Sequence, residues 1–144
     1  MCSSDLGHVA RGAAFGDLNN DGSIDAVISI MDGHPAILYN ESPRRSWIRL
    51  ELLSQWSNRP AIGAVVQVHT GGRVIHRQLK GGGSYLSAND PRLLVGLGTA
   101  ESVEKVEILW PGGARTTLDH PAFAQTHRVR EPKADAAVLL RGAK

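Results

Sequence analysis

Apolar and polar residues alternate along much of this chain, which is the pattern of a β-strand whose sheet has one buried face. From residue 47 to residue 52, Ile48, Leu50 and Leu52 fall on one face and polar or bulky residues fall on the other. The same alternation runs over residues 103–110. The chain also has 16 Gly and 7 Pro residues, which supply many turn positions. Together these features predict an all-β fold.

The middle of the chain predicts a β-hairpin. Residues 64–70 and 73–80 alternate in the same way, and two consecutive glycines separate them, as in a two-residue hairpin turn. With those glycines as the loop, Val68 lies opposite Ile75 on the apolar side, and we expect both to be buried. The other side of the hairpin is polar and is expected to face solvent.

A second pattern lies near the N-terminus, where oxygen-bearing side chains occur at the first, third, fifth and ninth positions of residues 17–25 and glycine occupies the sixth. Calcium prefers several oxygen ligands around one point, and a loop with this spacing turns them inward. Gly22 allows the sharp turn because it has no Cβ. The predicted ligands are the side-chain oxygens of Asp17, Asn19, Asp21 and Asp25 and the backbone carbonyl of Ser23.

This loop differs from an EF-hand, which needs a bidentate Glu at its twelfth position, where this chain has Ile28. The following residues 26–30 are largely β-branched, so a loop between two strands is favoured over a loop between two helices. The alternative interpretation is a solvated turn without metal, because Asp, Asn and Gly favour turns in any case.

Composition excludes several classes of protein. Sixteen Lys and Arg residues against 14 Asp and Glu leave a formal charge of +2, too small to favour nucleic acid as a partner. No apolar run reaches the roughly 20 residues of a membrane-spanning helix, so we expect no membrane insertion. Cys2 is the only cysteine, so no internal disulfide can form. Residues 1–6 lack the features of a signal peptide, and we expect them to be a non-native N-terminus.

The loop and its flanks resemble one FG-GAP/VCBS repeat, through Ala14-Phe15-Gly16-Asp17-Leu18-Asn19-Asn20-Asp21-Gly22. The resemblance implies a blade of a calcium-binding β-propeller. A propeller needs several blades, so a single repeat over residues 7–45 implies an incomplete propeller and a C-terminal fragment of a longer protein.

Residues 46–131 resemble the ASPIC/UnbV domain, which follows such repeats in secreted proteins related to cartilage acidic protein. The resemblance implies an antiparallel β-sandwich and an extracellular or periplasmic location. Residues 132–144 are expected to form a tail. The matching residues are Ser57-Asn58-Arg59-Pro60-Ala61-Ile62-Gly63-Ala64, Gly83-Ser84-Tyr85-Leu86-Ser87, Gly96-Leu97-Gly98 and Trp110-Pro111-Gly112-Gly113.

No residue pattern predicts catalysis. Ser84 lacks the second glycine and the helix of a nucleophile elbow, and no nucleophile is paired with a base. His69 and His76 lie diagonally on one hairpin face, without a nearby Asp or Glu in the predicted hairpin, so we interpret them as exposed polar residues.

These observations predict a non-enzymatic, calcium-binding interaction or adhesion module whose partner is an extracellular protein or glycan. The alternative is an accessory module of an enzyme or biosynthetic system that binds carbohydrate or a protein partner. In that case Trp56, in a polar loop, is the candidate ligand contact, because aromatic rings stack on sugars.

Overall fold

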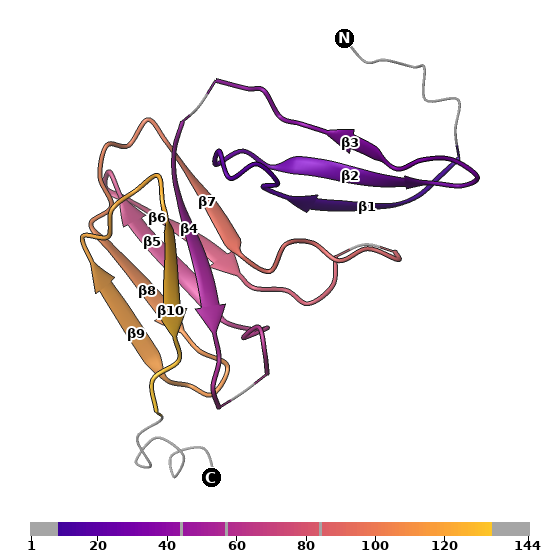
Figure 1. Cartoon of the computed structure of the whole chain (residues 1–144). Helices are drawn as coiled ribbons and strands as arrows, with labels where there is room; N and C mark the ends of the chain where they lie inside the picture. Colours follow the sequence, from indigo (N-terminus) through magenta and orange to yellow (C-terminus); the bar gives the residue numbers. More distant parts are fainter. Residues whose placement is uncertain (1–8, 44, 57, 84, 134–144) are drawn as a thin grey trace. The chain divides into compact units, whose positions relative to one another are not determined.

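The structure, a computed structural model, describes residues 9–43, 45–56, 58–83 and 85–133. Within these ranges every regular element is a β-strand and there is no helix. The strands form three sheets, none of which closes into a barrel (Figure 1). The predicted all-β fold class is therefore confirmed. The strands are β1 Ala10–Gly16, β2 Asp25–Ile30, β3 Ala36–Leu38, β4 Ser46–Leu53, β5 Val65–Thr70, β6 Arg73–Gln78, β7 Leu93–Gly98, β8 Lys105–Leu109, β9 Arg115–Asp119 and β10 Thr126–Arg130.

The chain divides into two compact units. The first consists of the described parts of Met1–Arg44 together with Gly82–Asp90, and the second of Arg45–Gly81 and the described parts of Pro91–Lys144. Residues 82–90 lie inside the predicted domain 46–131 but pack with the first unit. The predicted non-native N-terminus, 1–6, lies outside the described residues, and so does nearly all of the predicted tail, 132–144.

The first unit is an antiparallel sheet of order β1-β2-β3. The strands predicted on either side of the aspartate-rich loop are present. Residues of β1, β2 and β3 align across the sheet in two rows of three, so the six side chains of these rows lie on one face. All six are apolar. These residues are Ala13, Phe15, Ala26, Ile28, Ala36 and Leu38.

A segment distant in sequence lies against β1. The backbone N–H of Asp90 donates to the carbonyl of Phe15 at 2.9 Å. The N–H of Phe15 in turn donates to Oδ1 of Asn89 at 3.0 Å. The approach is so close that a Cβ on Gly12 would lie 2.7 Å from the Ser87 hydroxyl oxygen. A side chain at this position would force the neighbouring segment to shift, because the Ser87 hydroxyl and the carbonyls of Tyr85 and Leu86 occupy its space.

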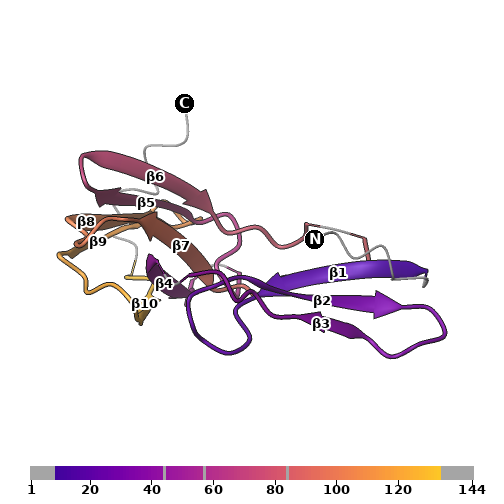
Figure 2. The same cartoon turned by 90° about the horizontal axis from the view of Figure 1, so that it is seen from above.

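The second unit contains the other two sheets, of order β10-β4-β7 and β6-β5-β8-β9, which Figure 2 shows as separate layers. Strand β4 pairs with β7 antiparallel, but β10 pairs with β4 in parallel. The predicted antiparallel pairing is therefore wrong for this one pair. A parallel pair is possible here because no hairpin turn joins β10 to β4; β10 follows a loop after β9.

One apolar core belongs to the second unit and takes side chains from both of its sheets. Ile48, Leu50 and Leu52 of β4 are buried, as their alternation predicts. Trp110 is also buried, and its indole N–H donates to the Thr116 hydroxyl at 2.8 Å. The core residues are Ile48, Leu50, Leu52, Ala61, Ala64, Val66, Val68, Leu79, Val95, Leu97, Val103, Val106, Ile108, Trp110 and Val129.

The predicted hairpin is β5–β6. Val68 pairs with Ile75, and Gly71 and Gly72 form the turn with φ angles of 54° and 68°. Positive φ at both positions is what a two-residue hairpin turn requires, and glycine adopts it without strain. Val68 is fully buried, but the expectation of burial for Ile75 is wrong. It is only partly buried because β6 is the outermost strand of its sheet.

Replacing Gly12 with alanine should lower the free energy of unfolding of the first unit by about 1–3 kcal/mol, because the new methyl group overlaps the 85–87 segment. Hydrogen exchange of the β1 and β2 amides would measure this loss. The matched control is Gly82→Ala, where a Cβ meets no atom within 4 Å. Equal protection of β1 in both variants would contradict the close packing.

Candidate functional site

The aspartate-rich loop connects β1 to β2, and its first and ninth residues are buried: Asp17 is 2 % exposed and Asp25 is 1 % exposed. The two carboxylate oxygens of Asp17 accept hydrogen bonds from the backbone N–H groups of Asp21, at 3.1 Å, and Gly22, at 2.7 Å. Buried carboxylates need such compensation. Asp17 therefore folds the middle of the loop around itself.

Asp25 does the same for the two ends of the loop. Its oxygens accept from the N–H of Leu18 at 2.8 Å and from the N–H of Asn40 at 2.9 Å. Asn40 follows β3, so this carboxylate links the loop to the third strand of the sheet. The loop is thus shaped by hydrogen bonds from two buried acids.

The third, fifth and seventh positions form the outer turn. Asn19 Oδ1 accepts from the Asp21 N–H at 3.1 Å, and its Nδ2 donates to Asp21 Oδ2 at 3.0 Å. The other Asp21 oxygen accepts from the Ser23 N–H at 2.8 Å. Asn20 and Gly22 have φ angles of 61° and 89°, a conformation that Asn and Gly tolerate. These successive turns are the arrangement that the solvated-turn interpretation describes.

The structure brings the five predicted metal ligands into one turn, but it does not gather their acids around one point. Within the described ranges, no group of three or more His, Cys, Asp or Glu side chains could hold a metal ion. The donor chemistry nevertheless suits a hard cation, because every candidate atom is an oxygen. The residues therefore fit calcium in chemistry, and the two interpretations from the sequence both stay open.

In the second unit, a loop after β4 carries Trp56, which is 60 % exposed. Glu131 is buried beneath this loop, where its Oε2 accepts from the Ser54 hydroxyl at 2.5 Å and more weakly from the Trp56 N–H at 3.4 Å. Further along, the side chain of Asn58 both accepts from the N–H of Ile62 and donates to its carbonyl. The loop therefore presents an exposed indole on a hydrogen-bonded backbone. The sequence did not indicate Glu131, since an acid just beyond a final strand carries no pattern.

Residues 54–136, more than half of the 144-residue chain, match the family of ASPIC and UnbV proteins. The chain belongs to this family. No curated protein matches the sequence. The matched ASPIC/UnbV region includes the Trp56 loop, the β5–β6 hairpin and Glu131, whereas the aspartate-rich loop lies before it.

Within the ASPIC/UnbV region, His69 has a charged neighbour that the sequence did not reveal. Its Nε2 lies 2.7 Å from Glu107 Oε2, and Lys105 Nζ lies 3.1 Å from Glu107 Oε1. The hydrogen bond from Lys105, and then that from His69, lowers the pKa of Glu107. The hairpin itself has no acid, as the sequence shows, and the acid beside His69 comes from the neighbouring strand β8. The signal was available, because Val106 and Ile108 face the core and so place Glu107 on the outer face.

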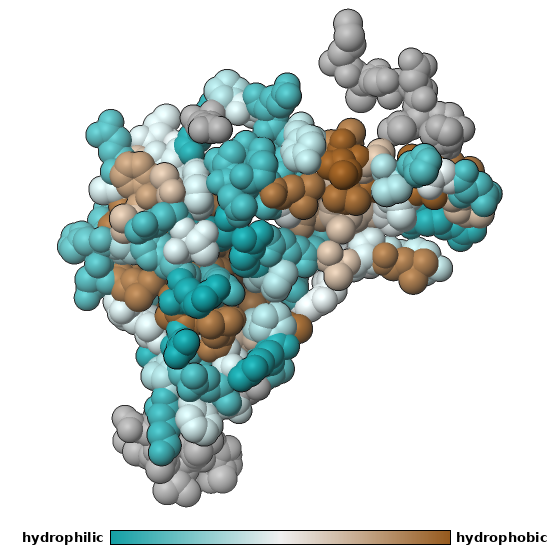
Figure 3. Space-filling view, viewed as in Figure 1, coloured by the Kyte–Doolittle hydropathy of each residue, from teal (hydrophilic) through white to brown (hydrophobic). Residues whose placement is uncertain are grey.

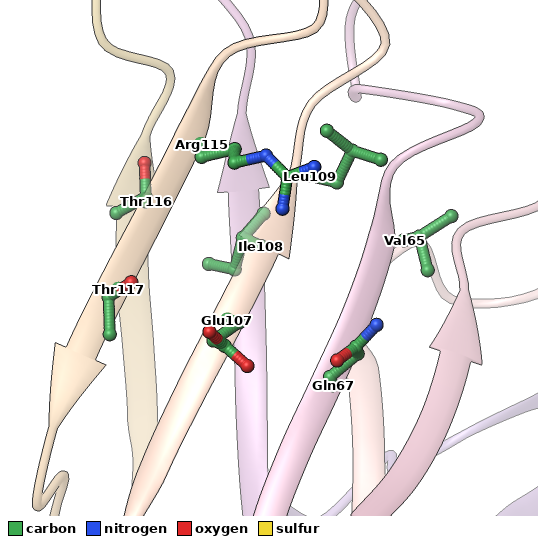
Figure 4. A pocket seen from close by; sticks show the side chains of 8 residues that line it. All are labelled: Val65, Gln67, Glu107, Ile108, Leu109, Arg115, Thr116 and Thr117. Carbon is green, nitrogen blue, oxygen red and sulfur yellow. The ribbon is translucent and has the colours of Figure 1, made fainter.

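The same outer face has a shallow depression of about 150 Å³ over β5, β8 and β9 (Figure 4). Figure 4 shows Gln67 and Glu107 on neighbouring strands, with Arg115 extending toward Leu109. Ligand pockets are typically roughly 300–1,000 Å³, so this hollow is too small to enclose a ligand. Its lining residues are Val65, Gln67, Glu107, Ile108, Leu109, Arg115, Thr116 and Thr117.

None of the elements in the described part of the chain is a helix long and apolar enough to cross a membrane.

Replacing Lys105 with methionine should raise the pKa of Glu107 toward its ordinary value, because the hydrogen bond from Lys105 is the largest cause of the lowered pKa. A lowered pKa stabilises the fold above the unfolded-state value, and this contribution disappears as the pH falls through the folded-state value. Since Glu107 is partly exposed, the effect on stability is small. NMR titration of the Glu carboxyl carbons would measure the shift. An unchanged Glu107 titration in the variant would contradict the assignment, and His69→Asn should have a smaller effect.

Proposed function

We propose that this ASPIC/UnbV chain is a non-enzymatic, calcium-binding interaction or adhesion module that works outside the cytoplasm, in an extracellular or periplasmic space. The observation that carries the proposal is the burial of two carboxylates, Asp17 and Asp25, in one nine-residue loop rich in oxygen ligands. The second unit is proposed to be a β-sandwich that supplies the interaction surface.

The electrostatics of the loop support calcium. Asp17 and Asp25 concentrate negative charge where little water reaches them, and Asp21 adds a third carboxylate. A divalent cation would offset this charge, and calcium is the hard cation that accepts flexible sets of six to eight oxygens. Its ligands would be Asp17, Asn19, Asp21, Asp25 and the carbonyl of Ser23. Bound calcium would stabilise the loop and the β1–β2 connection.

The first unit is proposed to be an FG-GAP/VCBS-like blade, and the distribution of its apolar residues supports this. An isolated sheet would be expected to have one polar face. Here the face with Phe15 and Leu38 has six apolar residues in register, and the opposite face has the apolar row Ala14, Val27 and Ile37. Phe15, Ile37, Leu38 and Tyr39 are exposed, and Figure 3 shows apolar side chains gathered over the β3 region. A sheet with exposed apolar side chains suits stacking against further sheets, as blades do in a propeller.

A second candidate function is carbohydrate binding by the Trp56 loop. The exposed indole, on a loop held by Glu131 and Asn58, favours this candidate because a rigid aromatic surface loses little entropy on binding. The interaction role does not require sugar recognition through Trp56, so the two functions make different predictions.

Calcium titration by calorimetry should give a Kd on the order of 0.1–1 mM or weaker, as for extracellular calcium modules. Asp21→Ala should abolish the signal. At a calcium concentration ten times the Kd, the loop and its strands should gain about 1.4 kcal/mol. The matched control is Asp32→Asn, which neutralises an exposed acid in the β2–β3 turn and should leave the Kd unchanged.

Hydrogen exchange with and without calcium would show which of the two units responds to the ion. Calcium should increase protection in β1 and β2 and leave β5 and β8 unchanged, because only the first unit contains the loop. The calcium proposal fails if titration gives no heat and no change in protection up to about 10 mM, ten times the upper end of the expected Kd range. The loop would then be an ordinary solvated turn.

A glycan array tests the second candidate. Trp56→Ala should abolish any specific binding, because the indole face supplies the stacking surface, and Trp47→Phe on β4 serves as the control. Signals that are absent for the native chain, or unchanged by Trp56→Ala, would exclude this loop as a sugar site.

A further inference from the structure

Strand β6 presents an unpaired backbone edge. It is the outermost strand of the sheet β6-β5-β8-β9, and no described strand pairs with its other side (Figure 2). In a two-residue hairpin the residues that close the turn, Thr70 and Arg73, bond to each other, and bonded pairs then alternate. The bond from the Leu79 N–H to the Ala64 carbonyl, at 2.9 Å, follows this alternation. The backbone groups of Val74, His76 and Gln78 therefore point away from β5.

The edge is also basic. Between Glu51 and Asp90 the sequence has no Asp or Glu, and its Lys and Arg residues are Arg59, Arg73, Arg77 and Lys80. Among the described residues, no carboxylate pairs with Arg73, Arg77 or Lys80. All three side chains are exposed. The positive charge of this edge is therefore not neutralised within the described chain.

The side chains of β6 follow a specific order. Arg73, Ile75 and Arg77 pair with inward-facing residues of β5, so they share the core side of the sheet. Ile75 is only partly covered. The two arginines lie four residues apart, about 13 Å along the strand. A strand added to this edge would thus meet a cation, an apolar residue and a cation in succession.

Part of β6 borders a shallow hollow of about 570 Å³, whose lining of Val65, His76, Arg77, Gln78 and Lys80 lies mostly on the outer face of the hairpin. The Arg77 guanidinium, at Nη1, donates to the outward carbonyl of His76 at 2.9 Å. This arginine therefore occupies one acceptor of its own edge. An incoming strand that replaces this bond would leave the guanidinium available to a carboxylate.

We propose that β6 binds an extended acidic peptide, which adds antiparallel to the sheet and has the pattern acid–any–apolar–any–acid. Its two acids would pair with Arg77 and Arg73, and its apolar residue would cover Ile75. Strand addition derives affinity from backbone hydrogen bonds and specificity from alternate side chains. The inference rests on the interaction role proposed above, but it uses no residue of the cation loop.

Exposed edge strands also carry charges simply to prevent pairing with other chains. On that interpretation Arg73 and Arg77 repel any added strand, and a matching peptide does not bind. The experiment below distinguishes these two roles, because they predict opposite responses to the same peptide.

The probe is a fluorescein-labelled heptapeptide, Thr-Glu-Thr-Val-Thr-Glu-Thr, titrated with the full chain and followed by fluorescence anisotropy. We expect saturable binding that weakens about tenfold or more in the double variant Arg73→Glu and Arg77→Glu, because two attractive cross-strand pairs become repulsive. The matched control is Arg115→Glu on β9, at the opposite edge of the same sheet, which changes the net charge in the same sense. It should leave the affinity within about twofold.

Two further peptides test the mode of binding. Replacing both glutamates with glutamine should also weaken binding, but less than the double variant does, because it removes the attraction without adding repulsion. N-methylation of the two central threonines, which face β6 in this register, should abolish binding because it removes the backbone donors. Absence of binding by the native chain, equal binding of the N-methylated peptide, or an equal loss in Arg115→Glu would each overturn the proposal. A sulfated oligosaccharide that binds the chain at β6 while the peptide does not would identify a polyanion surface instead.

Calorimetric calcium titration of the same samples keeps this result separate from the calcium proposal. The β6 variants should bind calcium as the native chain does, and Asp21→Ala should bind the peptide normally. Loss of hydrogen-exchange protection in β5 and β8 of a β6 variant would show that its second unit is misfolded, and the glutamine and N-methylated peptides would then decide with the native chain alone.

Discussion

A sheet with one covered face can bury only every second side chain of each strand, and the second unit depends on this constraint. Strand β5 has neighbours on both sides, and its Val66, Val68 and Thr70 point into the core. Val65, Gln67 and His69 must then point outward. The outer face of this sheet, with His69, Glu107 and the depression of Figure 4, is therefore a consequence of core packing.

The first unit obeys a different constraint. Its three strands have apolar side chains on the Phe15–Leu38 face, and residues 85–90 lie against β1. Its most buried polar groups are Asp17 and Asp25, which accept hydrogen bonds from backbone N–H groups on both sides of the loop. The loop is therefore part of the structural framework of this unit, and a ligand there would act on the stability of β1 and β2.

The two units also differ in charge. The aspartate-rich loop concentrates carboxylates in the first unit, whereas the described hairpin of the second unit carries arginines, a lysine and histidines without an acid of its own. The formal charge of the whole chain, +2, does not reveal this separation, because the negative charge of the first unit nearly cancels the positive charge of the second. The cation proposal and the acidic-peptide proposal follow from these opposite local charges, and each can fail without the other.

The sequence alone determined the strands, because period-two alternation and turn glycines are local properties of the chain. Ile48, Leu50 and Leu52, the Val68–Ile75 pairing and the burial of Trp110 all follow from them. It also located the aspartate-rich loop, although cation binding there stays a prediction. Only the tertiary structure decided which distant segments meet: residues 85–90 beside Gly12, Glu107 beside His69, Glu131 beneath Trp56, and β10 parallel to β4. Such contacts join residues far apart in sequence, and alternation sets the face on which a side chain lies without naming its neighbour.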